Sequence, residues 1–92
     1  MSAFNINEDE TLSKISRYEL SRDEGRFWIE VHEVIAGERE GVFVACPTLF
    51  VSSAKQEYIV KSDSAEEALI NCLHKIKNVS IDEIFENRSV TQ

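Results

Sequence analysis

The sequence predicts an α+β fold: an antiparallel β-sheet of three to four strands, then a C-terminal helix packed on one face, plus a short terminal helix. Two observations predict it. Residues 26–61 are dense in aromatic and β-branched side chains, interrupted by short glycine- or proline-containing segments. Apolar residues then recur at helical spacing from Ala65 to Ile76. Short connections between strands, with the helix last, favour an antiparallel sheet covered on one side.

The strands are expected around two turns. Residues 15–20 and 26–35 flank a turn at residues 22–25, and a charged turn with glycines at both ends, residues 37–41, leads into a third strand at 42–46. Pro47 cannot donate to a ladder, so it is expected to end this strand, mark a bulge or lie at an edge, with residues 49–51 resuming the strand beyond it. Residues 56–61 are predicted to be a fourth strand.

The helix is the best-specified element. Ser64 with Glu67 three residues later forms a capping-box pattern, with Asp63 as the competing cap. Ser80 and Glu83 repeat this pattern before a short second apolar stretch. The apolar stripe of the main helix is Ala65, Ala68, Leu69, Cys72, Leu73 and Ile76.

Length and composition predict a single domain spanning residues 1–92. The chain has 92 residues, of which 42% are hydrophobic and 29% charged, an ordinary globular balance. Residues 1–12 and 87–92 are polar and are expected to be loose tails. The first residues lack the basic and apolar regions of a secretory signal, and no apolar run is long enough for a membrane. We therefore expect a cytoplasmic protein, of bacterial or phage origin, with reduced thiols.

The acidic balance argues against direct nucleic-acid binding. The chain carries 17 acidic and 10 basic side chains, a net charge of −7, with no basic cluster. Affinity for a phosphate backbone comes mainly from clustered lysine and arginine. The acidity either serves solubility or marks an inhibitor that mimics nucleic acid or meets a basic partner.

Cys72 and His74 resemble a chemical site but are expected to be ordinary helix residues. Residues two apart on a helix point in nearly opposite directions. Cys72 is therefore expected in the core and His74 in solvent. A zinc site that recruits Cys46 and His32 lacks the short paired spacings of such sites. The sequence predicts no metal, no cofactor and no catalytic residue, since phosphate-loop and hydrolase motifs are also missing.

The candidate functional surface is one face of the sheet. Strand alternation places Phe27, Ile29 and Val31 on one side and Trp28, His32 and Val34 on the other. One helix covers one face, so the second face needs the terminal helix or the N-terminal arm as a cover, or else is an interface. Trp28, His32 and Val34 are therefore predicted to bind another protein or a second copy in a homodimer.

Two stretches resemble HicB-like antitoxin domains. Tyr18–Val31, YELSRDEGRFWIEV, is similar to the family's first hairpin, and Ser62–Leu69, SDSAEEAL, to its strand running into a helix. The resemblance implies a non-catalytic protein that neutralises a toxin. The sequence thus predicts a small non-enzymatic protein-binding or self-associating module, with an antitoxin-like or acidic inhibitor as the alternative.

Overall fold

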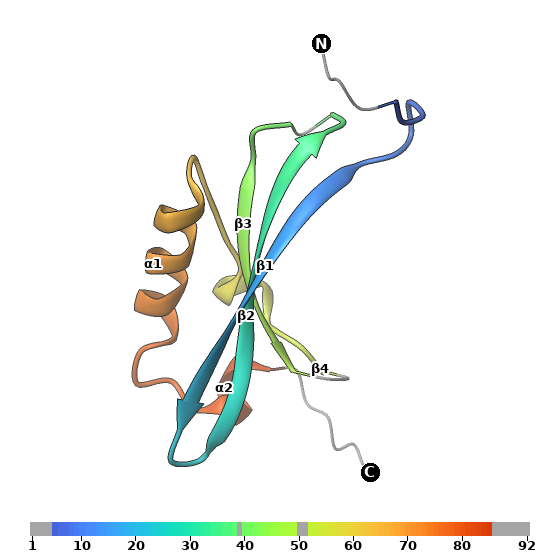
Figure 1. Ribbon diagram of the computed structural model, residues 1–92. Helices are drawn as coiled ribbons and strands as arrows, with labels where there is room; N and C mark the ends of the chain where they lie inside the picture. The colour runs from blue at the N-terminus through green and yellow to red at the C-terminus, as the bar shows by residue number, and fades with distance from the viewer. Residues whose placement is uncertain (1–4, 39, 50–51, 86–92) are drawn as a thin grey trace.

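The computed structural model describes residues 5–38, 40–49 and 52–85, and over these it has the predicted α+β architecture (Figure 1). One helix lies against an antiparallel sheet, and a second short helix follows it. In chain order the elements are β1 (Leu12–Arg22), β2 (Gly25–Ala36), β3 (Phe43–Leu49), β4 (Ser52–Ser53), a 3-10 turn (Gln56–Tyr58), β5 (Val60–Ser62), α1 (Ala65–Ile76) and α2 (Ile81–Ile84).

The sheet has two different edges. β1, β2 and β3 are neighbours in that order, and all pairings are antiparallel. Beyond β3, residues 43–45 pair with β5 and residues 48–49 pair with β4. One edge is therefore the 11-residue strand β1, and the other is divided between two short segments.

Gly41 sets the register between β2 and β3. Its N–H donates to the carbonyl oxygen of Val34 at 2.9 Å, while the N–H of Val34 donates to the oxygen of Val42 at 3.0 Å. Two residues of one strand thus face one residue of the other, which is a β-bulge, and Gly41 has φ +92. Glycine adopts that conformation without steric cost.

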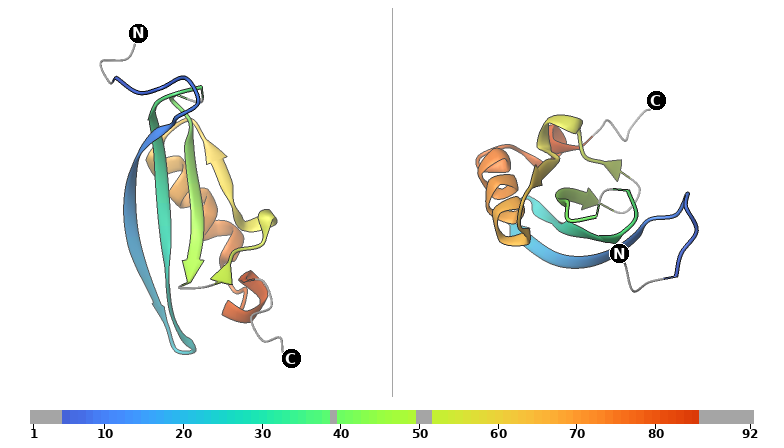
Figure 2. Two further views of the ribbon diagram at one scale, coloured as in Figure 1. Left: turned by 90° about the vertical axis from the view of Figure 1, so that its right-hand side faces the viewer. Right: turned by 90° about the horizontal axis from the view of Figure 1, so that it is seen from above.

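Both helices cover the same face of the sheet. Seen from the opposite side, α1 lies behind the strands (Figure 2). Between the sheet and α1 lie Phe27, Ile29 and Val31 of β2, all no more than 3% exposed. α2 joins this side, because the Phe85 ring that follows it packs edge-on against Phe27 with centroids 5.5 Å apart. The core cluster consists of Phe27, Ile29, Val31, Ala45, Ala54, Val60, Ala68, Cys72, Ile76, Ile84 and Phe85.

The predicted caps of both helices are present. The hydroxyl of Ser64 accepts from the N–H of Glu67 at 3.1 Å, and that of Ser80 accepts from Glu83 at 3.2 Å. α1 ends in a turn in which the N–H of Val79 donates to Ile76 and Asn78 has φ +66, a conformation that asparagine tolerates. Ala65, at the first turn of α1, is exposed and does not join the buried stripe.

Two strand predictions need correction. Residues 56–58 form a 3-10 turn, and only Val60–Ser62 of the predicted fourth strand pairs with the sheet. β3 does not end at Pro47 but continues through it, opposite Ile29. On the other side of β3, Pro47 lies between the residues paired with β5 and those paired with β4. A missing N–H is tolerated there because the ladder on that side is interrupted. Pro47 therefore lies within an inner strand, at a local gap in the pairing, and not at an edge of the sheet.

The predicted tails lie partly outside the described residues. Residues 5–11 contain neither helix nor strand but include a turn in which Glu10 donates to the oxygen of Asn7, and Leu12 already belongs to β1. Residues 87–92 are outside the described part. No helix within the described residues is both long and apolar enough to cross a membrane.

Candidate functional site

The face of the sheet opposite the helices is the first candidate surface. Register identifies its members, because directly opposed residues of antiparallel strands point to the same side. His32 stands between Ile15 and Val44, Glu30 between Arg17 and Cys46, and Trp28 between Glu19 and Thr48. We call this surface the open face; its residues are Ile15, Arg17 and Glu19 of β1, Trp28, Glu30 and His32 of β2, and Val44, Cys46 and Thr48 of β3.

The centre of the open face combines the Trp28 ring with a row of three polar side chains, Arg17, Glu30 and His32. The Arg17 guanidinium lies 4.9 Å from the centroid of the Trp28 ring, a cation–π contact. Arg17 Nε is 3.7 Å from Glu30 Oε2, and Glu30 Oε1 is 3.4 Å from His32 Nε2. These side chains remain accessible: 54% of Arg17, 34% of His32 and 28% of Glu30 is exposed. The face therefore offers apolar area edged by both signs of charge.

The open face also carries Cys46, but the thiol is not activated. Burial raises the pKa of Cys46, and the negative charge of the neighbouring Glu30 raises it further. A reactive cysteine needs the opposite environment, one that favours the thiolate. His32 is directed to Glu30 rather than to the sulfur, while the thiol donates to the carbonyl oxygen of Pro47 at 3.3 Å. Cys46 and His32 thus lie on one face without forming a nucleophile and its base.

The structure separates Cys72 from His74 as predicted. Cys72 is fully buried against the sheet, and its thiol lies 3.5 Å from the carbonyl oxygen of Tyr58. Burial raises the pKa of Cys72 to about 11, with Cys46 adding to this shift and Lys75 opposing it. His74 is exposed on the other side of α1. No group of three or more His, Cys, Asp or Glu side chains suited to a metal ion occurs in the described part of the chain.

The three residues predicted to bind a partner do not have equal access. Trp28 and His32 are partly exposed on the open face, with Glu30 between them in the alternation of β2. Val34 is only 9% exposed. It lies near the turn at residues 37–41, at the end of the sheet where Glu10 and Thr11 lie against Gly37. The accessible part of the open face therefore ends before Val34, although strand alternation places this residue on the same face.

Of the members of the open face that the sequence did not identify as binding residues, two matter most for its chemistry. Ile15, 52% exposed, and Arg17 lie on β1, whose alternation is weak. The available signal was the hairpin: the turn at residues 23–24 places Arg22 opposite Gly25, and counting back from it places Arg17 opposite Glu30. That count requires knowing the length of the turn.

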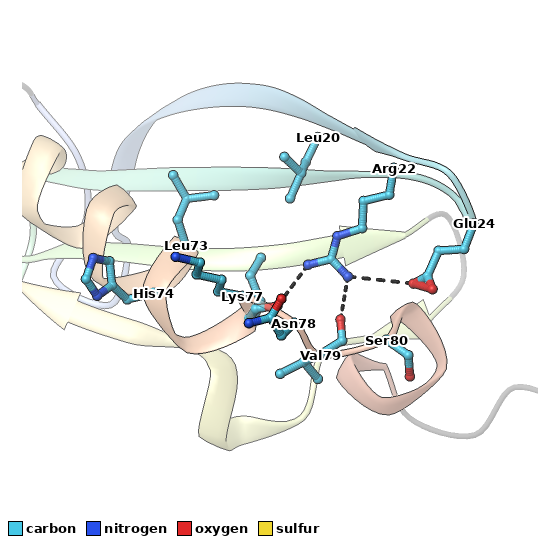
Figure 3. A pocket seen from close by; sticks show the side chains of 10 residues that line it. Leu20, Arg22, Glu24, Leu73, His74, Lys77, Asn78, Val79 and Ser80 are labelled. Carbon is cyan, nitrogen blue, oxygen red and sulfur yellow. Dashed lines mark hydrogen bonds and ion pairs between the residues drawn. The ribbon is translucent and has the colours of Figure 1, made fainter.

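A groove on the other side of the sheet is the second candidate surface (Figure 3). It has a volume of about 640 Å³ and lies between the end of β1 and the C-terminal end of α1. Its apolar walls come from Leu20, Leu73, Ile76 and Val79, and its polar rim from Arg22, Glu24, His74, Lys77, Asn78 and Ser80.

The central polar group of the groove is already bound within the protein. Arg22 donates from Nη2 to the carbonyl oxygen of Ile76 at 2.8 Å and from Nη1 to that of Val79. Glu24 Oε2 lies 3.6 Å from Arg22 Nη1 and accepts the N–H of Ile81 at 2.7 Å. The last carbonyl of α1, the carbonyl of Val79 in the connection between the helices, and the first N–H of α2 all gain partners in this way. Arg22 and Glu24 connect the hairpin to the helices. The polar groups of the groove therefore have a structural role.

Comparison with known proteins gives no family match for this chain. No family model matches it, and neither a curated protein nor a solved structure does.

Proposed function

We propose that this protein is a small non-catalytic binding module that engages another protein through the open face. The observation that carries the proposal is that α1 and α2 lie on one side of the sheet, while Trp28 and Ile15 stay accessible on the other. Accessible aromatic and apolar side chains on a strand face, surrounded by charge, are typical of protein interfaces.

The chemistry of the open face specifies the kind of partner. Trp28 with Arg17 stacked on it combines two residue types enriched in interface hot spots. Glu19, Glu30 and His32 border this pair. The partner is expected to place an apolar or aromatic side chain against Trp28 and to offer charges of both signs around it, because a surface of one sign would be repelled by part of this border.

The unactivated Cys46 and the engaged Arg22 support a non-catalytic role. The candidate nucleophile is held as a thiol, and the arginine of the groove is committed to helix carbonyls. Neither candidate surface combines a nucleophile, a base within reach and a free donor for a developing charge, which acyl- or phosphoryl-transfer sites require.

The experiment is affinity capture from a nuclease-treated lysate of the native host, using the full chain. Ile15→Ala and Trp28→Ala remove apolar area from the open face, and Ile70→Ala is the matched control. Ile70 is 46% exposed on α1, close to the 52% of Ile15, but on the helix side of the molecule. A stoichiometric protein retained by wild type and Ile70→Ala and lost with the other two variants supports the proposal. Equal capture by all four proteins contradicts it.

An antitoxin-like role is the specific form of this proposal that the sequence resemblance suggests. The two stretches that resemble HicB-like domains are the β1–β2 hairpin and the segment leading from β5 into α1. Such a role predicts that the captured partner is a toxic enzyme whose activity falls when this chain is added. A partner that retains full activity in the complex argues against it.

A nucleic-acid mimic, the other alternative, needs carboxylates gathered on one face. Asp23 with Glu24 and Asp82 with Glu83 do lie close together, because Glu24 accepts the N–H of Ile81 at the start of α2. The charge is nevertheless mixed elsewhere: Glu66 and Glu67 lie at the start of α1, and Arg17 lies among the carboxylates of the open face. Binding of the captured partner that weakens steeply with salt would revive this alternative.

A further inference from the structure

β1 is a long strand with a free edge. Its 11 residues pair with β2 on one side, and no described strand pairs with it on the other. Exposed edges are templates for further pairing, and proteins usually protect them with charged side chains, proline, bulges or short strands. The charges of β1 have both signs, so they oppose pairing only in registers that place like charges opposite each other. Here the one register shift lies between Leu12 and Ser13, at the start of the strand, and the rest is regular and free of proline and glycine. The opposite edge of the sheet, in contrast, is broken into β4 and β5.

The ladder shows which backbone groups of β1 point outward. The N–H and C=O of Val34 bond to β3. Because these groups alternate in direction along a strand, those of Val31 and Ile29 face β1. Their partners Ser16 and Tyr18 therefore bond inward. The N–H and C=O groups of the intervening residues, Ile15, Arg17, Glu19 and Ser21, point away from the sheet and are open to a new strand.

The side chains of β1 are complementary to β1 itself. In an antiparallel two-fold pairing centred on Tyr18, Arg17 faces Glu19 of the second copy, and Glu19 faces Arg17 of the second copy. Both pairs fall on the open face, and their backbone groups are among those that point outward. Centring on Arg17 or Glu19 instead would oppose like charges, which is destabilising across strands. An isologous interface requires this kind of self-complementarity.

We propose that β1 pairs with β1 of a second copy in this register, so that two sheets join into one continuous sheet. Tyr18, 46% exposed on the helix side beyond the reach of α1, meets its own symmetry mate as a cross-strand aromatic pair. Lys14 falls opposite Arg22 of the second copy, but that guanidinium is held by the carbonyls of Ile76 and Val79 and is turned toward the helices. Main-chain hydrogen bonds supply the affinity, as in other strand-addition complexes.

The pairing brings the two open faces side by side. Ile15 and Arg17 of each copy lie next to the junction, the two-fold axis passes between the two Tyr18 residues, and the combined face presents two Trp28 side chains. The dimer does not depend on a partner bound to this face. A partner that binds would contact a surface formed by the open faces of both copies.

The test is the molar mass of the full chain, measured by light scattering or sedimentation over a range of protein and salt concentrations. Wild type is expected to dimerise, more weakly as salt rises. Arg17→Glu places a carboxylate opposite Glu19 of the second copy at both symmetry-related pairs. It should therefore raise the dissociation constant of the dimer by about tenfold or more. The double variant Arg17→Glu/Glu19→Arg restores opposite charges and should restore the dimer. Lys61→Glu, an equal charge change at an exposed side chain of β5 on the opposite edge of the sheet, should leave it intact.

Disulfide trapping tests the register. In a Cys46→Ser background, Tyr18→Cys should cross-link two copies on mild oxidation, because residue 18 faces itself across the axis. Ser16→Cys, on the same side of the strand, faces Leu20 of the second copy and should not. A monomer at every concentration, a dimer indifferent to Arg17→Glu, or equal cross-linking at residues 16 and 18 would each overturn the proposal. None of these results depends on whether the Trp28 and Ile15 variants lose a captured partner.

Discussion

The guanidinium of Arg22, the last residue of β1, lies 2.8 Å from the carbonyl oxygen of Ile76, the last residue of α1. Residues separated by more than half the chain are joined at this point. The same guanidinium donates to Val79 and lies 5.3 Å from the centroid of the Phe27 ring. One side chain thus connects the hairpin, the end of the main helix and the edge of the core, where a helix otherwise leaves its last carbonyls without partners.

Arg22→Ala is expected to destabilise the fold. The substitution removes the guanidinium that donates to the carbonyls of Ile76 and Val79 and that lies beside the carboxylate of Glu24. The side chain of Arg22 is only 21% exposed. Charge-assisted hydrogen bonds at partly buried positions contribute enough for a loss of about 2 kcal/mol in the free energy of unfolding. Urea unfolding measures this.

The matched control is Arg26→Ala at the other end of the same turn. The side chain of Arg26 is 67% exposed and meets Glu19 at 3.4 Å, so its removal should cost no more than about 0.5 kcal/mol. Equal losses for Arg22→Ala and Arg26→Ala would show that the contacts of Arg22 do not hold the helices to the hairpin.

Stability is expected to fall in alkaline solution partly because of Cys72. Burial raises the pKa of its thiol from 9.0 to about 11. The unfolded chain then loses this proton at a lower pH than the folded chain. The contribution of Cys72 to the free energy of unfolding is therefore fully present below pH 9.0 and declines as pH rises toward about 11.

The measurement is urea unfolding at several pH values for wild type and Cys72→Ala. Between pH 9 and 11 wild type should lose more stability than the variant does, even though the variant is less stable at neutral pH because it carries a small cavity. If the free energy of unfolding fell equally with pH in both proteins, the thiol would have the same pKa in the folded and unfolded states.

The two thiols are expected to differ in accessibility. At neutral pH a thiol reagent should modify Cys46 before Cys72, which is fully buried.

Local patterns predicted much of this fold. Ser64 and Ser80 mark both helix starts, because capping depends on residues three apart. The buried side of β2 followed from alternation, since Phe27, Ile29 and Val31 repeat with the period of a strand. Both signals are contained in a few consecutive residues and need no knowledge of distant parts of the chain.

The errors lie where distant segments decide the outcome. The β-forming residues Tyr58 and Ile59 were assigned to a strand, but Gln56–Tyr58 makes a 3-10 turn between two strands that share β3 as a neighbour. Pro47 stays within β3 because the pairing on its far side changes there from β5 to β4. Val34 is buried although the alternation of β2 places it on the open face with Trp28 and His32.

The candidate site was predictable only in part. Trp28 and His32 followed from alternation within β2, whereas Arg17 and Ile15 reach the same face through the register of β1 against β2. Which side the terminal helix would cover had no local signal: α2 joins the core through Ile84 and Phe85 on the side of α1. That choice leaves the open face accessible.

Site-specific photo-cross-linking in the native host tests the central claim most directly. A photoreactive amino acid is placed at Ile15, on the open face, or at Ile70, an equally apolar and similarly exposed position on α1. We expect the Ile15 position to yield a discrete cross-linked species that contains a different protein, and the Ile70 position to yield none. Cross-linking to that protein only from Ile70, or equally from both positions, would contradict the assignment of the open face as the binding surface.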